Sequence, residues 1–346
     1  MLKWYEESAD NSDVVVSSRI RLARNLSKYP FSPKLSKSQS KEMIKELERE
    51  LSFPISPERP LHWIQVNTLS DIDKVALVER HLISETLAAK EDTTAVMISD
   101  DEVVSIMLNE EDHIRIQTMS GGMNLEKAFS IADAIDDEIN KKFAYAYHER
   151  LGYLTTFPTN VGTGLRVSYM LHLPGIARTK KLASISSDIG RFGVTIRGMS
   201  NDKENGIGNL YQIYNQKTLG RDEKELIQEL GTIANQIIKQ ERRVRNKMMQ
   251  DNKNLLEDTL LRSYGLLKYC KSLEIEEGMN LLSNVQLGIT TGIIRLDVDE
   301  NFNIYSLVMG IQPAHLEKEE NRALKKEERD ILRAEYVQKH LPDILK

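Results

Sequence analysis

Apolar and polar residues alternate in some stretches of the chain and recur at helical spacing in others. Alternation, which is typical of half-buried strands, marks residues 14–26, 93–119, 194–197 and 211–219. Apolar residues three and four apart indicate amphipathic helices, and they mark residues 37–51, 71–89, 125–142, 175–190, 222–251, 256–267, 275–286 and 327–338. Few strand signals follow residue 252, so we predict an α+β domain over residues 1–250 and a small helical domain over residues 251–346.

One strand-like stretch, SIMLNEEDHIRIQ at residues 105–117, carries an unusual run of charge. Three consecutive acids, Glu110 to Asp112, are followed by His113 and Arg115. Charges buried near a sheet are costly unless they are paired or bind a ligand. Taken alone, the stretch is most simply a polar turn between two strands. Arginine-bearing stretches elsewhere favour a site in which an anionic ligand faces these carboxylates.

The first of those stretches is the predicted strand at residues 14–26. Its period of two places Ser17, Arg19 and Arg21 on one face. Two neighbouring arginines repel each other unless an anion lies between them, and a solvated edge strand is the alternative. A second stretch is the turn-rich loop before Arg166, which contains Pro158 and two glycines. Such a loop lets the backbone approach a ligand closely, although a plain connection between strands has the same composition.

Composition narrows the classes of partner and compartment. The net charge of −5 gives no general attraction to nucleic acid or anionic membranes, so an anion site must be a local group of arginines or lysines. The single cysteine, Cys270, excludes internal disulfides and a cysteine-rich metal site, and it fits a reducing cytoplasm. No signal peptide or apolar span of membrane length is present. The chain also lacks the P-loop, the dinucleotide-binding glycine motif and the signatures of ordinary protein kinases.

Four stretches, SSRIRLARN, NEEDHIR, PTNVGTGLR and TIRG, occur in this order between residues 14 and 250. Together they resemble the guanidino (phosphagen) kinase family. The resemblance implies an antiparallel sheet flanked by helices, on which arginines hold ATP with Mg²⁺ and no P-loop. The matching phosphate-binding positions are Arg19, Arg21, Arg115, Arg166 and Arg197, and His81 is expected near the adenine. The wider ATP-binding segments implied are Ser17, Ser18, Ile20, Val167, Ser168, Tyr169, Met170, Gly198, Met199, Ser200, Asn201 and Asp202.

The domain order points to one branch of the family. Small-molecule guanidino kinases carry a helical domain before the SSRIR motif, whereas here the motif starts at Ser17 and the helical part follows the catalytic domain. This order resembles the bacterial protein-arginine kinases of the McsB type. Their RDxxRA motif, which binds phosphoarginine as an allosteric signal, corresponds here to Arg329, Asp330, Arg333 and Ala334. On a helix the two arginines share a face and suit a phosphate clamp, although a solvated charged face has the same spacing.

The implied reaction moves the γ-phosphoryl group of ATP onto a guanidinium nitrogen, which needs positioning and charge neutralisation. Arginines suit the phosphates because their planar fork binds oxygens bidentately. The acceptor is cationic and poorly nucleophilic, so a carboxylate must orient it and accept a proton. Glu111 matches the family's catalytic glutamate. Asp202 stands where the family's RGxxGE loop has its second glutamate, with Glu204 as a possible substitute.

The chain departs from the family at three positions, because Phe157 replaces a cysteine, Asn201 a glycine and Asp202 a glutamate. An active protein-arginine kinase is therefore weighed against a weakened relative that binds nucleotide or phosphoarginine as an adaptor. A small-molecule guanidino kinase and a nucleic-acid binder fit less well. The resemblance also implies protein quality control in the stress response. The partners would be protein substrates with exposed arginine, including a heat-shock repressor, a zinc-binding activator of the McsA type, and a Clp ATPase and protease. The C-terminal helices would suit a homodimer, and no direct contact with nucleic acid or membrane is expected.

Overall fold

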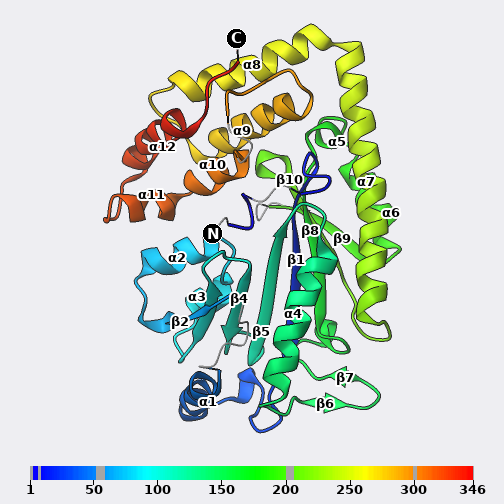
Figure 1. Cartoon of the computed structure of the whole chain (residues 1–346), viewed down its shortest axis with the longest axis vertical. Coiled ribbons are helices and arrows are strands. Elements are labelled where there is room, and N and C mark those ends of the chain that lie inside the picture. Colours follow the sequence, from blue (N-terminus) through cyan, green and yellow to red (C-terminus); the bar gives the residue numbers. More distant parts are fainter. Residues whose placement is uncertain (1–2, 7–8, 52–58, 200–205, 299–301, 346) are drawn as a thin grey trace.

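The computed structural model describes residues 3–6, 9–51, 59–199, 206–298 and 302–345. Its frame is an eight-stranded sheet in the order β2-β3-β4-β5-β1-β8-β10-β9, in which every neighbouring pair is antiparallel (Figure 1). The strands are β1 (Val15–Arg24), β2 (Leu61–Gln65), β3 (Ala95–Ser99), β4 (Val104–Leu108), β5 (Ile114–Gly121), β8 (Leu165–His172), β9 (Val194–Gly198) and β10 (Leu210–Asn215). A separate ribbon pairs β6 (Tyr147–His148) with β7 (Gly152–Tyr153).

Strand β1 runs through the middle of the sheet, between β5 and β8. One set of its alternating residues, including Ile20 and Leu22, is buried in the main hydrophobic core. Helices α4 (Leu125–Asn140) and α7 (Glu223–Asp251) contribute to the same core and cover that face of the sheet (Figure 1). The opposite face carries Arg19 and Arg21. One face of β1 therefore packs in the core and the other carries polar side chains.

Two predicted helices are broken, and their prediction as single helices is wrong. Residues 71–89 form α2 (Asp71–Glu79) and α3 (Glu85–Ala89), because the backbone turns at His81, whose φ is 61°. The turn delivers Leu82 and Ile83 into a small core cluster beneath the sheet edge. Residues 175–190 likewise form α5 (Pro174–Arg178) and α6 (Leu182–Gly190), with Lys180 at a φ of 54° between them.

The predicted strand at residues 211–219 is too long, since β10 ends at Asn215. The Asn215 side chain donates to the carbonyl oxygen of Leu165 at 3.1 Å and accepts from the amide of Val167 at 2.9 Å. These side-chain hydrogen bonds supply partners for the backbone groups of β8 at the point where its backbone pairing with β10 ends. Sequence patterns also missed β2 and the β6–β7 ribbon, whereas α1 (Lys37–Glu50) begins at a Ser36 capping box close to its predicted start.

The C-terminal part is helical and surrounds a second core cluster. It comprises α8 (Lys253–Tyr269), α9 (Ile275–Thr290), α10 (Ile304–Gly310), α11 (Pro313–Glu319) and α12 (Lys326–His340). Helices α10 and α11 were not expected from the sequence pattern. The predicted division at residues 250 and 251 falls at the end of α7. The predicted fold class, an antiparallel sheet flanked by helices with a helical C-terminal part, is confirmed.

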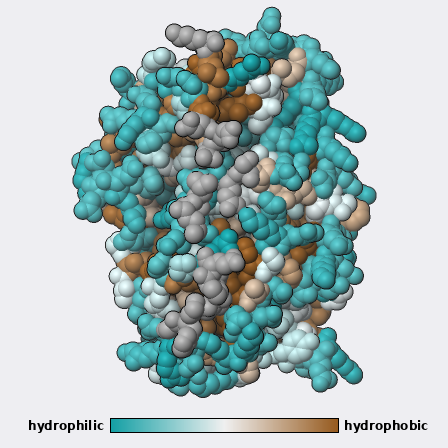
Figure 2. Space-filling model, in the orientation of Figure 1, coloured by the Kyte–Doolittle hydropathy of each residue, from teal (hydrophilic) through white to brown (hydrophobic). Residues whose placement is uncertain are grey.

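A buried ion pair ties α7 to the start of β1 and the end of β8. The Glu241 carboxylate accepts the amides of Gly175 and Ile176 at 2.9 and 2.8 Å, and it pairs with Arg245 at 2.7 Å. Arg245 in turn donates to the carbonyl oxygens of Asp13 and His172. Hydrophilic side chains cover most of one face of the molecule, with hydrophobic ones in small patches (Figure 2). Within the part of the chain that the structure describes, no helix combines the length and apolar character needed to cross a membrane.

Candidate active site

The face of the sheet opposite α4 and α7 is hollowed into a cavity of about 810 Å³. Separate segments of the chain contribute to it: β1, the turn after α2, the β4–β5 turn, β8 and β9. The predicted site residues that line it are Ser17, Arg19, Arg21, His81, Glu111, Arg115, Arg166, Ser168, Met170, Arg197, Gly198 and Met199. The cavity therefore brings the five predicted phosphate-binding arginines and the predicted catalytic glutamate together.

Strand register builds this arrangement. Arg21 of β1 lies opposite Arg166 of β8, and Arg19 lies opposite Ser168, whose hydroxyl oxygen accepts from the Arg19 Nε at 3.4 Å. On the other side of β1, Ala23 lies opposite Arg115. Because side chains two residues apart share a face, these pairings place the arginines in successive rows across one surface.

The arginine side chains repel one another; Arg19, Arg21, Arg115 and Arg166 are partly buried, whereas Arg197 is exposed. Burial, together with the positive charges of Arg115, Arg197 and Arg166, lowers the pKa of Arg19 to about 10. Burial and the charges of Arg19, Arg115 and Arg166 also lower the pKa of Arg21, against the opposing charge of Glu110. The buried Arg21 Nε has no hydrogen-bond partner among the described residues. The carboxylates of Glu110 and Glu111 offset part of this positive charge, and a polyphosphate would relieve the remaining repulsion and supply an acceptor for the Arg21 Nε.

Other protein groups orient one of the arginines. The Arg166 guanidinium donates to the Asn160 side-chain oxygen at 3.0 Å and to the carbonyl oxygen of Asn215 at 3.3 Å. It also lies 5.3 Å from the centre of the Tyr214 ring. Sequence reasoning did not single out Asn160 or Tyr214, although Asn160 belongs to the PTN part of a quoted motif.

The three consecutive acids of the β4–β5 turn have different surroundings. Glu110 is buried and accepts from the Ser84 hydroxyl at 2.5 Å and from the Arg115 guanidinium. Burial alone would raise the pKa of Glu110, but the Arg115 charge and these hydrogen bonds outweigh it, so the pKa is lowered. Asp112 accepts from the Asn25 side chain and the Thr156 amide, both at 2.7 Å. Glu110 and Asp112 are therefore fixed by the protein itself.

Glu111, between them, is half-buried and lines the cavity. Its carboxylate makes no hydrogen bond or ion pair with any residue that the structure describes. Burial raises the pKa of Glu111, the neighbouring charge of Glu110 raises it further, and Arg115 opposes the shift. An unpaired carboxylate with a raised pKa, facing a cavity, has the properties of a general base.

His113 completes the turn as a structural residue. Its Nδ1 accepts from the Leu26 amide at 3.0 Å, and its Nε2 lies 3.0 Å from the carbonyl oxygen of Pro30. The ring is therefore neutral, with the proton on Nε2, and burial lowers its pKa. It ties the β4–β5 turn to the segment that follows β1.

His81 sits in the turn between α2 and α3, and its carbonyl oxygen accepts from the Gln117 side chain at 2.6 Å. Burial and the Arg19 charge lower the pKa of His81 to about 4. The imidazole is thus neutral at pH 7 and adds no charge to the arginine group.

Several predicted ATP-binding residues do not line the cavity. Ile20, Val167 and Tyr169 alternate with the lining residues and lie in the core, and the Ser18 hydroxyl donates to the carbonyl oxygen of Gly122 at 2.7 Å. The predicted residues Ser200, Asn201 and Asp202 lie outside the described residues, as does Glu204. No group of three or more His, Cys, Asp or Glu suited to a metal ion occurs in the described ranges.

The RDxxRA residues lie on α12, away from this cavity. Arg333 is 1% exposed and donates to the carbonyl oxygens of Ile311 and Leu273, both at 2.8 Å, and to the Asp330 carboxylate at 2.6 Å. Arg329 is partly exposed and lies 3.5 Å from Glu317. Ala334 is buried in the second core cluster. Of the four residues on α12, Arg333 and Asp330 pair with each other, while Arg329 faces Glu317 and Ala334 packs in the core. Phosphoarginine binding by them stays a prediction.

Comparison with known proteins covers nearly the whole chain. The family model described as ATP:guanido phosphotransferase, C-terminal catalytic domain, matches residues 42–244. The model described as Protein-arginine kinase McsB C-terminal domain matches residues 253–346. A protein-arginine kinase of Caldanaerobacter subterraneus is 41% identical over 96% of this chain and 98% of its own length. A protein-arginine kinase of Halothermothrix orenii is 40% identical over 98% of this chain and 96% of its own length.

Solved structures with a similar fold are guanidino kinases. A duplicated taurocyamine kinase from Schistosoma mansoni matches 74% of this chain and 38% of its own chain, with a TM-score of 0.63 and 22% identity. A lombricine kinase matches 72% of this chain and 71% of its own chain, with a TM-score of 0.60 and 22% identity. The predicted resemblance and the assignment of the chain as a guanidino phosphotransferase are confirmed. The chain belongs to the ATP:guanido phosphotransferase family, in its protein-arginine kinase branch.

Proposed function

We propose that the protein transfers the γ-phosphoryl group of ATP to the guanidinium group of arginine residues in proteins. The observation that carries the proposal is Glu111, a carboxylate without a partner among the described residues, in a cavity that also holds five arginines. An anionic donor and a cationic acceptor need opposite charges at opposite ends of one site. The relatives named protein-arginine kinases support a protein as the acceptor.

The donor half of the site is the arginine group. Arg19, Arg21 and Arg166 lie in adjacent rows of the sheet and would hold the polyphosphate, with Arg115 and Arg197 at either side. Mg²⁺ would enter as part of the nucleotide substrate and neutralise charge between the phosphates. Because the arginines are fixed by the strands, they hold the phosphates without a glycine-rich loop.

The acceptor half is the turn that presents Glu111. A guanidinium nitrogen attacks the γ-phosphorus, the N–P bond forms, and the bond from phosphorus to the bridging oxygen of ADP breaks. The proton that the nitrogen loses passes to the Glu111 carboxylate. Glu110 and Asp112 position Glu111 by anchoring the turn on either side. Asp202 is proposed as the second carboxylate against the acceptor.

The family resemblance also suggests a cellular role for this activity. Phosphoarginine would mark proteins for a Clp-type protease during the stress response in the cytoplasm, with a heat-shock repressor among the substrates. A zinc-binding activator would switch the kinase on, and the C-terminal helices would form a homodimer. The adaptor alternative rests on Phe157 and Asp202, which differ from the family pattern.

The test is phosphoarginine itself. The purified protein is incubated with MgATP and an unfolded protein, with and without a candidate activator, and acid-labile phosphoarginine is detected by mass spectrometry. We expect product with the native protein and none with Glu111→Gln, while Glu276→Gln, which removes an exposed carboxylate on α9, retains activity. No product in either condition, with ATP binding intact, would favour the adaptor.

A further inference from the structure

The arginine cavity has a second wall that comes from the C-terminal helices. Tyr305, Val308 and Met309 of α10 and Gln312, just before α11, line the same cavity as the arginines. Val16, Met170 and Met199 of the catalytic domain also pack against the C-terminal core cluster. One continuous cavity therefore has walls from both parts of the chain.

Along β1 and β8 the residues that line this cavity change from charged to apolar. Ala23 and Arg115 lie nearest the Glu111 turn, Arg21 and Arg166 form the next row, and Arg19 and Ser168 the row after that. Further along lie Ser17, Met170 and Gln212, with Arg197 at the β9 end of the same row. Beyond them lie Leu210 and Val16, which pack in the core cluster of the C-terminal helices. At about 3.3 Å per residue, β1 carries this gradient over roughly 20 Å from Ala23 to Val16.

A nucleoside triphosphate has the same gradient, from triphosphate to an apolar flat base with a polar edge. We propose that α10 of the C-terminal part forms one wall of the base pocket, with Met309 and Val308 against the face of the adenine. Met170 and Met199 supply apolar surface from the sheet, and Gln212 lies between this surface and Arg197. This inference rests on the proposed use of ATP and adds a binding wall from outside the catalytic domain.

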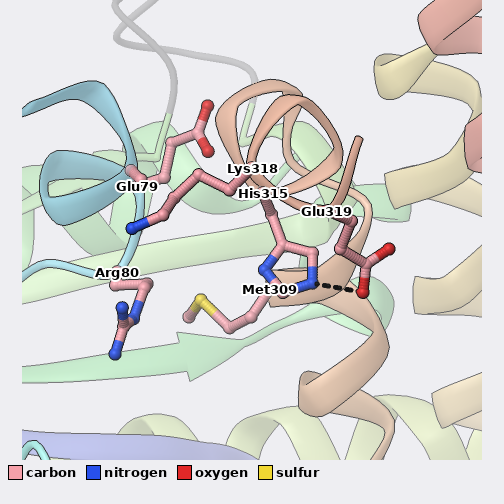
Figure 3. Close-up of a pocket in the computed structure, with 7 residues that line it drawn as sticks. Glu79, Arg80, Met309, His315, Lys318 and Glu319 are labelled. Atoms are coloured by element: carbon pink, nitrogen blue, oxygen red, sulfur yellow. Dashed lines mark ion pairs between the residues drawn. The ribbon is translucent and has the colours of Figure 1, made fainter. Parts of the chain in front are cut away.

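Met309 is the residue on which the two parts of the chain meet. It is partly buried and packs against the main core of the catalytic domain. It lines the arginine cavity and also a smaller cavity of about 270 Å³, which lies between the end of α2 and α11 and contains Glu79, Arg80 and His315 (Figure 3). Because Met309 faces both cavities, a change in its position would affect both the base pocket and the contact between α11 and α2.

That contact is held by polar groups. The Glu79 carboxylate accepts the Ala314 amide at 3.0 Å, and Lys318 pairs with Asp73 at 3.0 Å. His81, two residues beyond Glu79, lines the arginine cavity. Nucleotide affinity is thus coupled to the position of α10 and α11 by two routes, the direct wall at Met309 and the path through α2.

The experiment compares ATP with inorganic tripolyphosphate, which engages the arginines and has no base. Affinities of both are measured by calorimetry for the full chain, for Met309→Ala and Met309→Leu, and for Met249→Ala. Met249 is a matched control, because it is a partly buried methionine of the C-terminal cluster that lines neither cavity. Thermal unfolding of each variant shows that it is folded.

We expect Met309→Ala to bind ATP about three- to tenfold more weakly, because apolar contact with the base is lost. Tripolyphosphate affinity should stay within about twofold, and Met309→Leu and Met249→Ala should behave like the native protein. Unchanged ATP affinity in Met309→Ala, or equal weakening of both ligands, would overturn the inference. So would a native protein that binds ATP no better than tripolyphosphate. Absence of phosphoarginine with these binding differences intact would refute the proposed kinase activity and leave the base wall standing.

Discussion

The β4–β5 turn and helix α12 both carry a run of charged residues in a short motif, but the charged side chains have opposite surroundings. In the turn, the outer acids Glu110 and Asp112 are anchored and Glu111 is left unpaired in a cavity. On α12, Arg333 satisfies two backbone carbonyls and a carboxylate and is almost fully buried. The same kind of sequence signal thus gives an unpaired side chain in an open site in one case, and a buried, fully bonded side chain with a structural role in the other. We call the second a structural tie.

The difference follows from what surrounds each motif. A turn between two strands projects from the sheet edge, so one side chain can stay free when its neighbours hold the backbone. Arg333 reaches from α12 to the residue that follows α10, Ile311, and to Leu273 just before α9. Backbone carbonyls at such positions have no partner within a helix and need another donor. A buried guanidinium with five N–H groups satisfies such carbonyls well. A motif residue therefore shows its role by which of its polar atoms remain available.

The largest expected effect separates Glu111 from its anchored neighbours. Glu111→Gln should lower the rate of phosphoryl transfer by about 10²–10⁴-fold, since the acceptor loses its proton acceptor. ATP affinity should stay within about twofold, because the arginines are untouched. Single-turnover kinetics and calorimetry measure the two quantities. A variant that transfers phosphate at the native rate would assign the base to another group.

Arg333→Ala tests the structural tie on α12. Removing the guanidinium leaves the Asp330 carboxylate and two carbonyl oxygens without their donor, so we expect the free energy of unfolding to fall by about 3 kcal/mol or more. Urea denaturation of the full chain gives the value. Native stability combined with lost binding of a phosphoarginine peptide would show instead that Arg333 acts as a ligand-binding residue.

Sequence alone placed much of the cavity. Alternation in β1 put Ser17, Arg19 and Arg21 on one face, and they lie there. The motif resemblance added Arg115, Arg166 and Arg197, and the register of the sheet brings all five arginines into one surface. The resemblance supplied whole contiguous segments, so it also included Ile20 and Val167, whose side chains lie in the core as the alternation along each strand requires.

Other features depend on contacts between distant residues. The break at His81 arises because Leu82 and Ile83 are drawn into a core formed with β3 and β4, which overrides the helical spacing of residues 71–89. The α10 wall joins residues near position 308 to residues near position 16, and no local pattern encodes that pairing. Two of the partners of Arg333 are the backbone carbonyls of Ile311 and Leu273, which carry no sequence signal, whereas the third, Asp330, belongs to the motif itself.

The pH dependence should separate the unpaired Glu111 from its anchored neighbour Glu110 by a smaller effect. The Glu111 base acts only when ionised and its pKa is raised, so activity should fall on acidification at a pH above the ordinary glutamate value of about 4.3. The Glu110 pKa is lowered in the folded protein, so its stabilising pairing is fully present above the unfolded pKa and is lost only as pH falls through the lower folded value. Activity should therefore disappear before the fold does. Initial rates and circular dichroism over the same pH series check this, and a coincident loss of both would remove the distinction.

The smallest expected effect concerns Arg329, the partly exposed arginine of the motif on α12. Its guanidinium lies 3.5 Å from Glu317 and about a third of the side chain is exposed, so Arg329→Ala should change the free energy of unfolding by less than about 0.5 kcal/mol. If α12 binds phosphoarginine as predicted, the same substitution should still weaken that binding, because Arg329 is the arginine of the motif with the more accessible N–H groups. Calorimetry with a phosphoarginine peptide, beside urea denaturation, measures both quantities, and Lys339→Ala at the exposed end of α12 is the control. Unchanged peptide binding would indicate that the α12 motif has a structural role, and that of the two motifs only the Glu111 turn offers an unpaired side chain to a ligand.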